Sequence, residues 1–137
     1  MIHRVLRIGS WTVDFLFATR NYDIDGVLAC LRDAGAPDWV LDDALDLMEN
    51  CDYNCGFTYS RNRLSYANQL RHRAVMLIGP TTSGEQFLNT LAHEVRHLAD
   101  AVAHSYGVPL DSEPPAYMTG DTIMALADVI CELGCRK

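Results

Sequence analysis

The fold is decided by residues 87–102, which read FLNTLAHEVRHLADAV. Apolar residues recur in this stretch at intervals of three and four, the spacing that places side chains on one face of an α-helix. A neighbouring stripe carries Asn89, His93, His97 and Asp100. The stretch therefore predicts an amphipathic helix with an apolar face for a core and a polar stripe beside it.

This helix has recognisable signals at both ends. At its start, Thr82 with Glu85, or Ser83 with Gln86, can form a capping box. At its end, Gly107 suits the position just past the last turn, and a proline two residues later prevents continuation. We therefore expect the helix to end at about residue 105 or 106.

The rest of the chain predicts a small sheet and further helices. Strands are expected at 4–8 and 11–17, joined at Gly9-Ser10 as a hairpin, and at 55–59, 64–69 and 73–79. Helices are expected from Asp23 or Asp25 to about residue 34, from Pro37 onward, and from 116 to about 133. The predicted fold class is α+β, with a small antiparallel or mixed sheet. At 137 residues and 49% hydrophobic content, positions 1–137 suit a single domain.

Within the long helix, residues 93–97 form the pattern H-E-x-x-H. Positions i and i+4 stand on one helix face, so His93 and His97 can bind a single zinc ion at about 2.0–2.1 Å. Glu94 is rotated by about 100° around the helix, which places its carboxylate beside the metal as a general base for bound water. The alternative interpretation is a solvated helix face that carries two histidines and one acid.

A catalytic zinc requires a third protein ligand. The extended pattern H-E-x-x-H-x-x-G-x-x-H is not met, because Asp100 and Ala103 occupy its last two defined positions. His104 lies on the same face as the pair, but about 10 Å beyond His97 along the helix axis. The long helix therefore offers no third ligand of its own.

Glu113 is the better candidate for the third ligand. Pro114 and Pro115 suit the first turn of a new helix, which the preceding turn lets fold back against the first. Glu113 would reach the zinc from the start of this second helix. The alternative is an ordinary first-turn acid favoured by the helix dipole.

The pattern His93-Glu94-x-x-His97 followed by Glu113-x-x-Ala116 resembles the gluzincin clan of zinc metallopeptidases in its E-x-x-A variant. It is also similar to small proteins interpreted as metallopeptidases in bacteriophage and gut bacterial genomes. The resemblance covers about residues 73–121. It implies a zincin-like fold with an active-site helix and a C-terminal helix, and Zn²⁺ as the cofactor.

The resemblance also assigns roles. It implies that His93, His97 and Glu113 are the metal ligands, that Glu94 is the base, and that the strand at 73–79 belongs to a sheet whose edge can pair with an extended peptide. The chain departs from the clan in two ways. Tyr117 stands where the clan's other common variant has an acid, and the interval from His97 to Glu113 is short for the clan.

Other polar residues are candidates for supporting roles. Metal-bound histidines normally donate their second ring N–H to a carboxylate or carbonyl, for which Asp100, Asn89 and Asp121 are available. Tyr117, or else Tyr106, can supply an O–H to a developing oxyanion. The alternatives are surface positions for the first three residues and core positions for the tyrosines.

Taken together, these residues predict amide hydrolysis. The resemblance and the expected edge strand imply a peptide or protein substrate. One alternative is a non-catalytic zincin-fold protein that docks a partner. Another is a structural or regulatory phage protein in which the motif is coincidental.

Charge and hydropathy limit the partners. A net charge of −7 argues against nonspecific nucleic-acid binding. The basic cluster Arg61, Arg63, Arg71, His72 and Arg73 is more typical of a solvated hairpin face. No apolar run long enough for a membrane span and no signal-like segment occurs, which favours a cytoplasmic protein, in the host cytoplasm if the chain is viral.

The five cysteines are Cys30, Cys51, Cys55, Cys131 and Cys135. The last four form two C-x-x-x-C pairs, which could bind a structural zinc or form disulfides. An odd count without a secretory signal favours free thiols.

Overall fold

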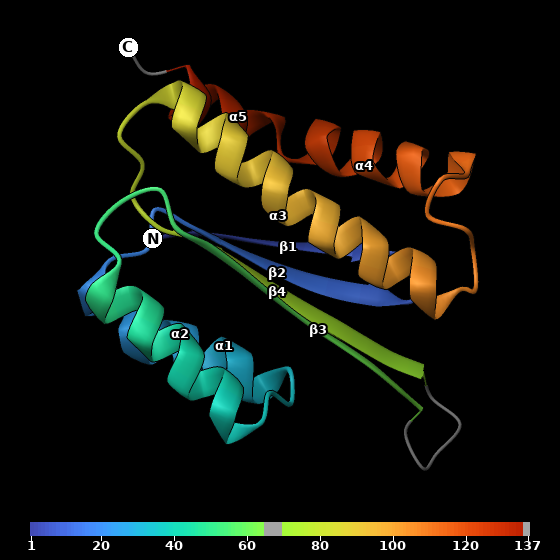
Figure 1. Ribbon diagram of the computed structural model, residues 1–137, viewed down its shortest axis with the longest axis horizontal. Helices are drawn as coiled ribbons and strands as arrows, with labels where there is room; N and C mark the ends of the chain where they lie inside the picture. The colour runs from blue at the N-terminus through green and yellow to red at the C-terminus, as the bar shows by residue number, and fades with distance from the viewer. Residues whose placement is uncertain (65–69, 136–137) are drawn as a thin grey trace.

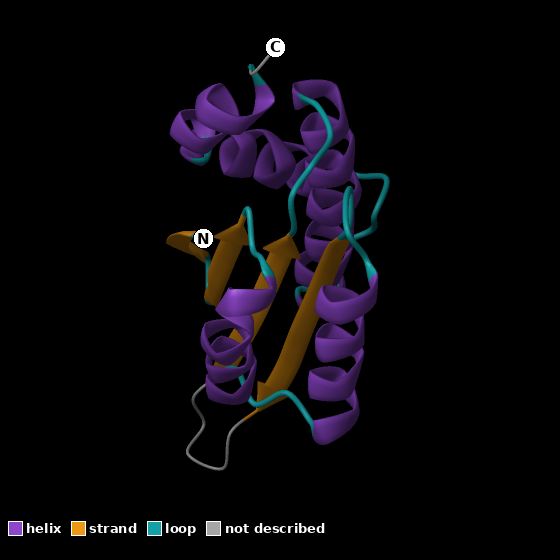
Figure 2. Cartoon of the chain, turned by 90° about the vertical axis from the view of Figure 1, so that its left-hand side faces the viewer, coloured by secondary structure: helices purple, strands orange, loops and turns teal. Residues whose placement is uncertain are grey.

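The computed structural model describes residues 1–64 and 70–135. Within these residues, four strands form one sheet: β1 (Ile2–Ile8), β2 (Trp11–Phe17), β3 (Gly56–Leu64) and β4 (Leu70–Ile78). A short 3-10 helix, η1 (Asn21–Asp23), precedes the first helix of the chain. The α-helices are α1 (Ile24–Asp33), α2 (Asp38–Asn50), α3 (Gly84–Ser105), α4 (Glu113–Ala125) and α5 (Ala127–Gly134). The sheet separates two helical layers, with α1 and α2 on one face and α3, α4 and α5 on the other (Figures 1 and 2).

The sheet is mixed, with strand order β1-β2-β4-β3. The hairpin β1–β2 is antiparallel, β2 and β4 are parallel, and β3 is antiparallel to β4. The predicted hairpin at Gly9-Ser10 is confirmed, and Gly9 has the positive φ of +59° that glycine tolerates at a tight turn. β1 and β3 form the two edges, so the predicted strand at 73–79 lies inside the sheet as part of β4.

The α+β class and the mixed sheet are confirmed, with one difference in the strands. The predicted strand at 55–59 belongs to β3, which continues to Leu64. The predicted strand at 64–69 falls almost wholly outside the described residues.

Alternation along the central strands gives each face its own core. Phe15 and Phe17 of β2 point into the core beneath α3, whereas Leu16 points into the core beneath α1 and α2. By the same alternation, the side chain of Asp14 faces α1 and α2, and the residue is only 6% exposed. A buried carboxylate on that face requires polar partners.

The expected ends of α3 are confirmed. Ser83 is the N-cap, and its Oγ accepts a hydrogen bond from the backbone N–H of Gln86 at 3.1 Å. The helix ends at Ser105, and Gly107 follows with φ +65°. Trp11 Nε1 donates to Ser105 Oγ at 2.9 Å, which ties this end of the helix to β2.

The expectation of one continuous helix from 116 to about 133 is wrong. α4 begins earlier, at Glu113, and the helical segment is interrupted at Leu126, which is fully buried. Pro114 and Pro115 do occupy the first turn, as predicted. The apolar pattern continues through Ile123 and Ile130 because α4 and α5 both pack apolar side chains against the core beneath α3, so hydrophobic periodicity gave no sign of the interruption.

Two expectations about side chains are corrected. Cys51 and Cys55 form a disulfide rather than free thiols, and their Cα atoms lie 6.4 Å apart, within the usual range for such a bond. Cys30, Cys131 and Cys135 are free.

The basic cluster is not simply a solvated hairpin face. His72 is 4% exposed and stacks on Trp11, with 4.9 Å between ring centroids. Arg73 forms ion pairs with Asp14 and Asp33. The side chains of Arg63 and Arg71 lie outside the described part of the structure.

Candidate metal centre

The H-E-x-x-H pattern lies in the middle of α3, where this helix crosses the edge strand β3. His93 and His97 are exposed, and their Nε2 atoms are 3.1 Å apart. Two nitrogens bound to one tetrahedral zinc at about 2.05 Å would lie about 3.3 Å apart. The imidazole pair therefore fits two adjacent ligand positions of such an ion.

Glu94 points from α3 toward β3 and is only 4% exposed. Thr58 Oγ1 donates a hydrogen bond to Glu94 Oε2 at 2.5 Å. Gly56 lies against the same side chain, since a Cβ atom there would be 2.7 Å from both Cγ and Oε1 of Glu94. The glycine thus provides space for the carboxylate, and the threonine holds one of its oxygens.

These groups line a shared hollow of about 400 Å³. It is lined by His93, Glu94 and His97 from α3 and by Gly56, Phe57, Thr58 and Ser60 from β3. Because β3 pairs only with β4 in the described sheet, the other edge of β3 beside the hollow has free backbone groups. The floor of the hollow can therefore hydrogen-bond an extended chain.

Glu113 is not brought to this hollow. It is exposed at the first position of α4. The next two residues, Pro114 and Pro115, contact a different hollow together with Val102 and Ala103 at the far end of α3. Ala103 is six residues beyond His97, or about 9 Å along the helix axis.

No ligand triad of His93, His97 and Glu113 exists among the described residues. One group of three or more His, Cys, Asp or Glu side chains there has all its ligand atoms within 4.8 Å of one another, and it includes none of these three. The structure thus brings together two imidazole nitrogens and a neighbouring carboxylate. The role of Glu113 stays a prediction.

The two tyrosines considered for oxyanion binding lie elsewhere. Tyr117 is 69% exposed and lines a hollow with Leu6 and Ile8 of β1. β1 and β3 are opposite edges of the sheet, so Tyr117 lies far from Glu94. The hydroxyl of Tyr106 accepts a hydrogen bond from the backbone N–H of Ser10 at 2.8 Å and so anchors the β1–β2 turn.

The candidates for orienting the histidines are near the pair in sequence but have other surroundings. Asp100 Oδ1 accepts from Arg96 Nε at 2.8 Å, an i,i+4 ion pair on α3. Asn89 is exposed one turn before His93. Asp121 lies with Tyr117 beside β1. The hydrogen bonds found among the described residues do not connect any of the three to His93 or His97.

Gly56 and Thr58 were missed by the sequence analysis. The signal was present, because Gly-Phe-Thr-Tyr-Ser at 56–60 alternates small and aromatic residues, which predicts a strand with one face of small side chains. What the sequence did not indicate is which element covers that face.

Comparisons with known proteins do not assign the chain to a family. No protein-family model matches the chain, and neither a curated protein nor a solved structure matches it significantly. Separately, none of the helices built from described residues is long and apolar enough to cross a membrane.

Proposed function

We propose that this chain is a zinc-dependent peptidase with a zincin-like fold and a gluzincin-type centre, in which His93 and His97 bind the metal and Glu94 is the general base. The observation that carries the proposal is the position of Glu94. Its carboxylate is buried against β3 beside two imidazole nitrogens that lie 3.1 Å apart. Burying a carboxylate is costly, and the hydrogen bond from Thr58 offsets part of that cost.

Zinc bound to the histidine pair would supply a Lewis acid, which lowers the pKa of a water molecule and polarises a carbonyl group. Glu94 would accept a proton from that water and pass it to the leaving amine. Thr58 would keep the carboxylate in one orientation by donating to Oε2, so Oε1 stays available for proton transfer. Gly56 gives the carboxylate room to approach the strand.

An extended peptide is the substrate class that suits the hollow. A chain laid along the free edge of β3 would form backbone hydrogen bonds with that strand and pass beside Glu94. Gly56, Thr58 and Ser60 present small side chains toward the hollow, so the substrate backbone is not held away from the histidines.

The third ligand in this proposal is Glu113, which requires the start of α4 to approach the histidine pair when metal binds. Glu113→Gln tests this requirement, and Asp111→Asn is the matched control because both acids are exposed near the start of α4. We expect weaker zinc binding by about 10-fold or more in the first variant only. If Glu113→Gln binds zinc as tightly as Asp111→Asn does, Glu113 is not a ligand, and the assignment of the histidine pair is unaffected.

The decisive experiment on catalysis is Glu94→Gln, assayed for zinc content and for cleavage of a mixed peptide library. We expect normal zinc content and a loss of hydrolysis of about 10²-fold or more. Glu85→Gln, an exposed acid in the first turn of the same helix, is the control and should cleave normally. Hydrolysis that persists in Glu94→Gln would contradict the role of Glu94.

A docking protein that keeps the zincin-like fold is the second candidate function. It is favoured by the distance of Glu113 from the pair, since a zinc site with two protein ligands is weak. In that case wild type and Glu94→Gln would both bind peptides along β3, and neither would cleave them.

A further inference from the structure

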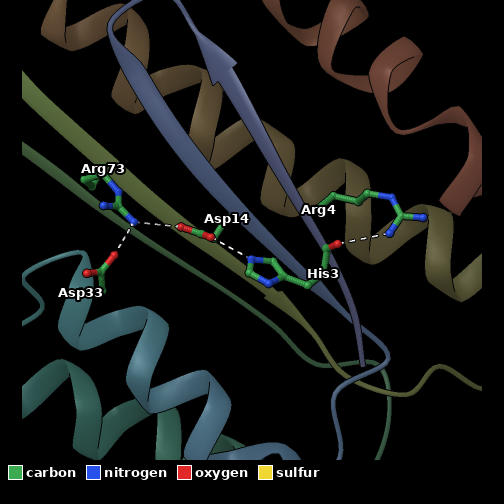
Figure 3. Close-up of polar contacts among 5 residues, drawn as sticks. All are labelled: His3, Arg4, Asp14, Asp33 and Arg73. Atoms are coloured by element: carbon green, nitrogen blue, oxygen red, sulfur yellow. Dashed lines mark hydrogen bonds and ion pairs between the residues drawn. The ribbon is translucent and has the colours of Figure 1, made fainter.

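A second cluster of ligand-type side chains lies on the opposite face of the sheet from His93. His3 of β1, Asp14 of β2 and Cys30 of α1 each offer one ligand atom, and these three atoms lie within 4.8 Å of one another. His3 Nε2 is 2.8 Å from Asp14 Oδ1. Figure 3 shows these two side chains directed toward each other, with Arg73 and Asp33 on the far side of Asp14.

Asp14 is the fixed point of this cluster. It is 6% exposed, and its Oδ2 accepts a hydrogen bond from Arg73 at 3.1 Å. Arg73 in turn donates to Asp33 at 3.0 Å. One carboxylate oxygen is therefore held by a cation while the other, Oδ1, faces His3.

We infer that His3, Asp14 and Cys30 form a binding site for a zinc-like divalent cation. Imidazole nitrogen, carboxylate oxygen and thiolate sulfur are the three ligand types that zinc takes in proteins, whereas calcium and magnesium take oxygen ligands. Ligand atoms of a tetrahedral zinc lie about 3.3–3.7 Å apart, so shifts of about 1 Å or less would bring all three onto one ion.

Arg73 has the place of an outer partner in such a site. Carboxylates that bind a metal are themselves usually hydrogen-bonded, and these partners orient the ligand. Arg73 meets this requirement without using Oδ1, the oxygen that would bind the cation. The ion pair and the metal site are therefore compatible.

A Cys–His–Asp catalytic relay is a different use of the same residue types, and the geometry does not fit it. In a relay the imidazole stands between nucleophile and carboxylate and contacts each with a different ring nitrogen. Here the sulfur of Cys30 lies within 4.8 Å of the carboxylate of Asp14 as well as of the ring of His3. The three groups converge on one point, as ligands do.

The cation would connect three elements that are separate in sequence. β1 is an edge strand, and its described partner within the sheet is β2 alone. A metal bound by His3, Asp14 and Cys30 would fasten this edge strand and α1 to the centre of the sheet. The His3 side chain is 41% exposed, which leaves room for water as the fourth ligand.

The test uses the full chain with both His93→Ala and His97→Ala, so that the proposed catalytic centre cannot bind a metal ion. Zinc content is measured after dialysis, and Co²⁺ is added separately to record the near-ultraviolet absorption that a cobalt–thiolate bond produces. We expect about one metal ion per chain, a cobalt–thiolate band, and a melting temperature that rises with zinc concentration.

Cys30→Ser and His3→Gln are then added one at a time. Each should lower the zinc affinity at least 10-fold, and Cys30→Ser should abolish the band. Cys131→Ser is the matched control, because this free thiol is exposed on α5. Asp14→Asn is not used, since it would also leave Arg73 without its buried partner.

Two results would overturn the inference. One is the absence of bound zinc and of a cobalt–thiolate band in the His93→Ala, His97→Ala protein. The other is zinc affinity that neither Cys30→Ser nor His3→Gln lowers, or zinc binding that the control Cys131→Ser abolishes. Neither result bears on the proposed peptidase centre, because that centre is disabled throughout.

Discussion

The two faces of the sheet each carry a histidine beside a buried acid, but the two acids are held in different ways. Glu94 is held by a neutral group, the hydroxyl of Thr58, and it packs into the space that Gly56 leaves by having no side chain. Asp14 is held by the guanidinium of Arg73. Among the described side chains, no ion pair of Glu94 with a lysine or arginine is found.

This difference separates what the two acids can do. Asp14 is held by the Arg73 guanidinium in the layer between the sheet and α1, where it can anchor an edge strand or a metal ion. Glu94 has no such partner among the described residues and lines the hollow together with His93 and His97, which is the position that the proposed general base requires.

The largest effect is expected from removing the space beside Glu94. Gly56→Ala places a Cβ atom within 2.7 Å of Glu94 Cγ and Oε1, so the carboxylate must move. We expect a loss of about 1–3 kcal/mol in the free energy of unfolding and a loss of peptidase activity of about 10²-fold. Urea unfolding and peptide cleavage measure the two effects.

Gly120→Ala is the control for that substitution, because a Cβ atom at Gly120 meets nothing within 4 Å. Its stability should stay the same or rise slightly, since alanine favours a helix over glycine. If Gly56→Ala behaves like Gly120→Ala, Glu94 is not held by contact with β3.

An effect of similar size on the free energy of unfolding is expected from removing the hydrogen bond to Glu94. Thr58→Val keeps the side-chain shape and the β-branch but leaves Oε2 without its donor. We expect a loss of about 1–3 kcal/mol in unfolding free energy, the range for leaving a buried acceptor without its donor. Ser60→Ala, on the same strand face, is the comparison and should cost less; equal losses would mean that the Thr58 hydroxyl does not hold the acid.

On the other face, the outer ion pair should matter little. Asp33→Asn removes one of two carboxylates bound by Arg73, but the Asp33 side chain is 73% exposed and Asp14 remains paired. We expect a change below about 1 kcal/mol in chemical denaturation. A loss as large as that of Thr58→Val would show that Arg73 needs both acids to hold Asp14.

The smallest effect concerns acid pH. Hydrogen bonds from Arg4, and next from the backbone of Val129, lower the pKa of the exposed Asp128 carboxyl group. Its stabilising contribution is therefore present above the unfolded pKa of about 3.9 and is lost as pH falls through the lower folded value. As pH is lowered from 5 to 2, the melting temperature should fall less steeply in Arg4→Gln than in wild type. Arg7→Gln is the control, and identical slopes in wild type and Arg4→Gln would mean that this ion pair contributes nothing.

The two acids also differ in how far the sequence could predict their sites. His93, Glu94 and His97 lie on one helix, where local spacing alone fixes their relative directions. His3, Asp14 and Cys30 come together only through strand pairing and helix packing, which no local spacing encodes. The position of Glu113 failed to follow from the sequence for the same reason, because it depends on how α4 crosses α3.

Element prediction shows the same division. α3 was predicted closely because its cap, its apolar period and its terminal glycine agree. The break at Leu126 was missed because α4 and α5 both present apolar side chains to one core. The parallel pairing of β2 with β4 was left open, since a mixed and an antiparallel sheet place the same residues in the core.

The most direct test of the central claim is the zinc content of protein that carries His3→Gln and Cys30→Ser, purified without chelator or nickel affinity. The account predicts about one zinc ion per chain, unchanged by Glu94→Gln and lost on His93→Ala. No bound zinc after zinc is added back, or zinc that survives His93→Ala, would contradict the claim that the histidine pair of α3 is a metal centre.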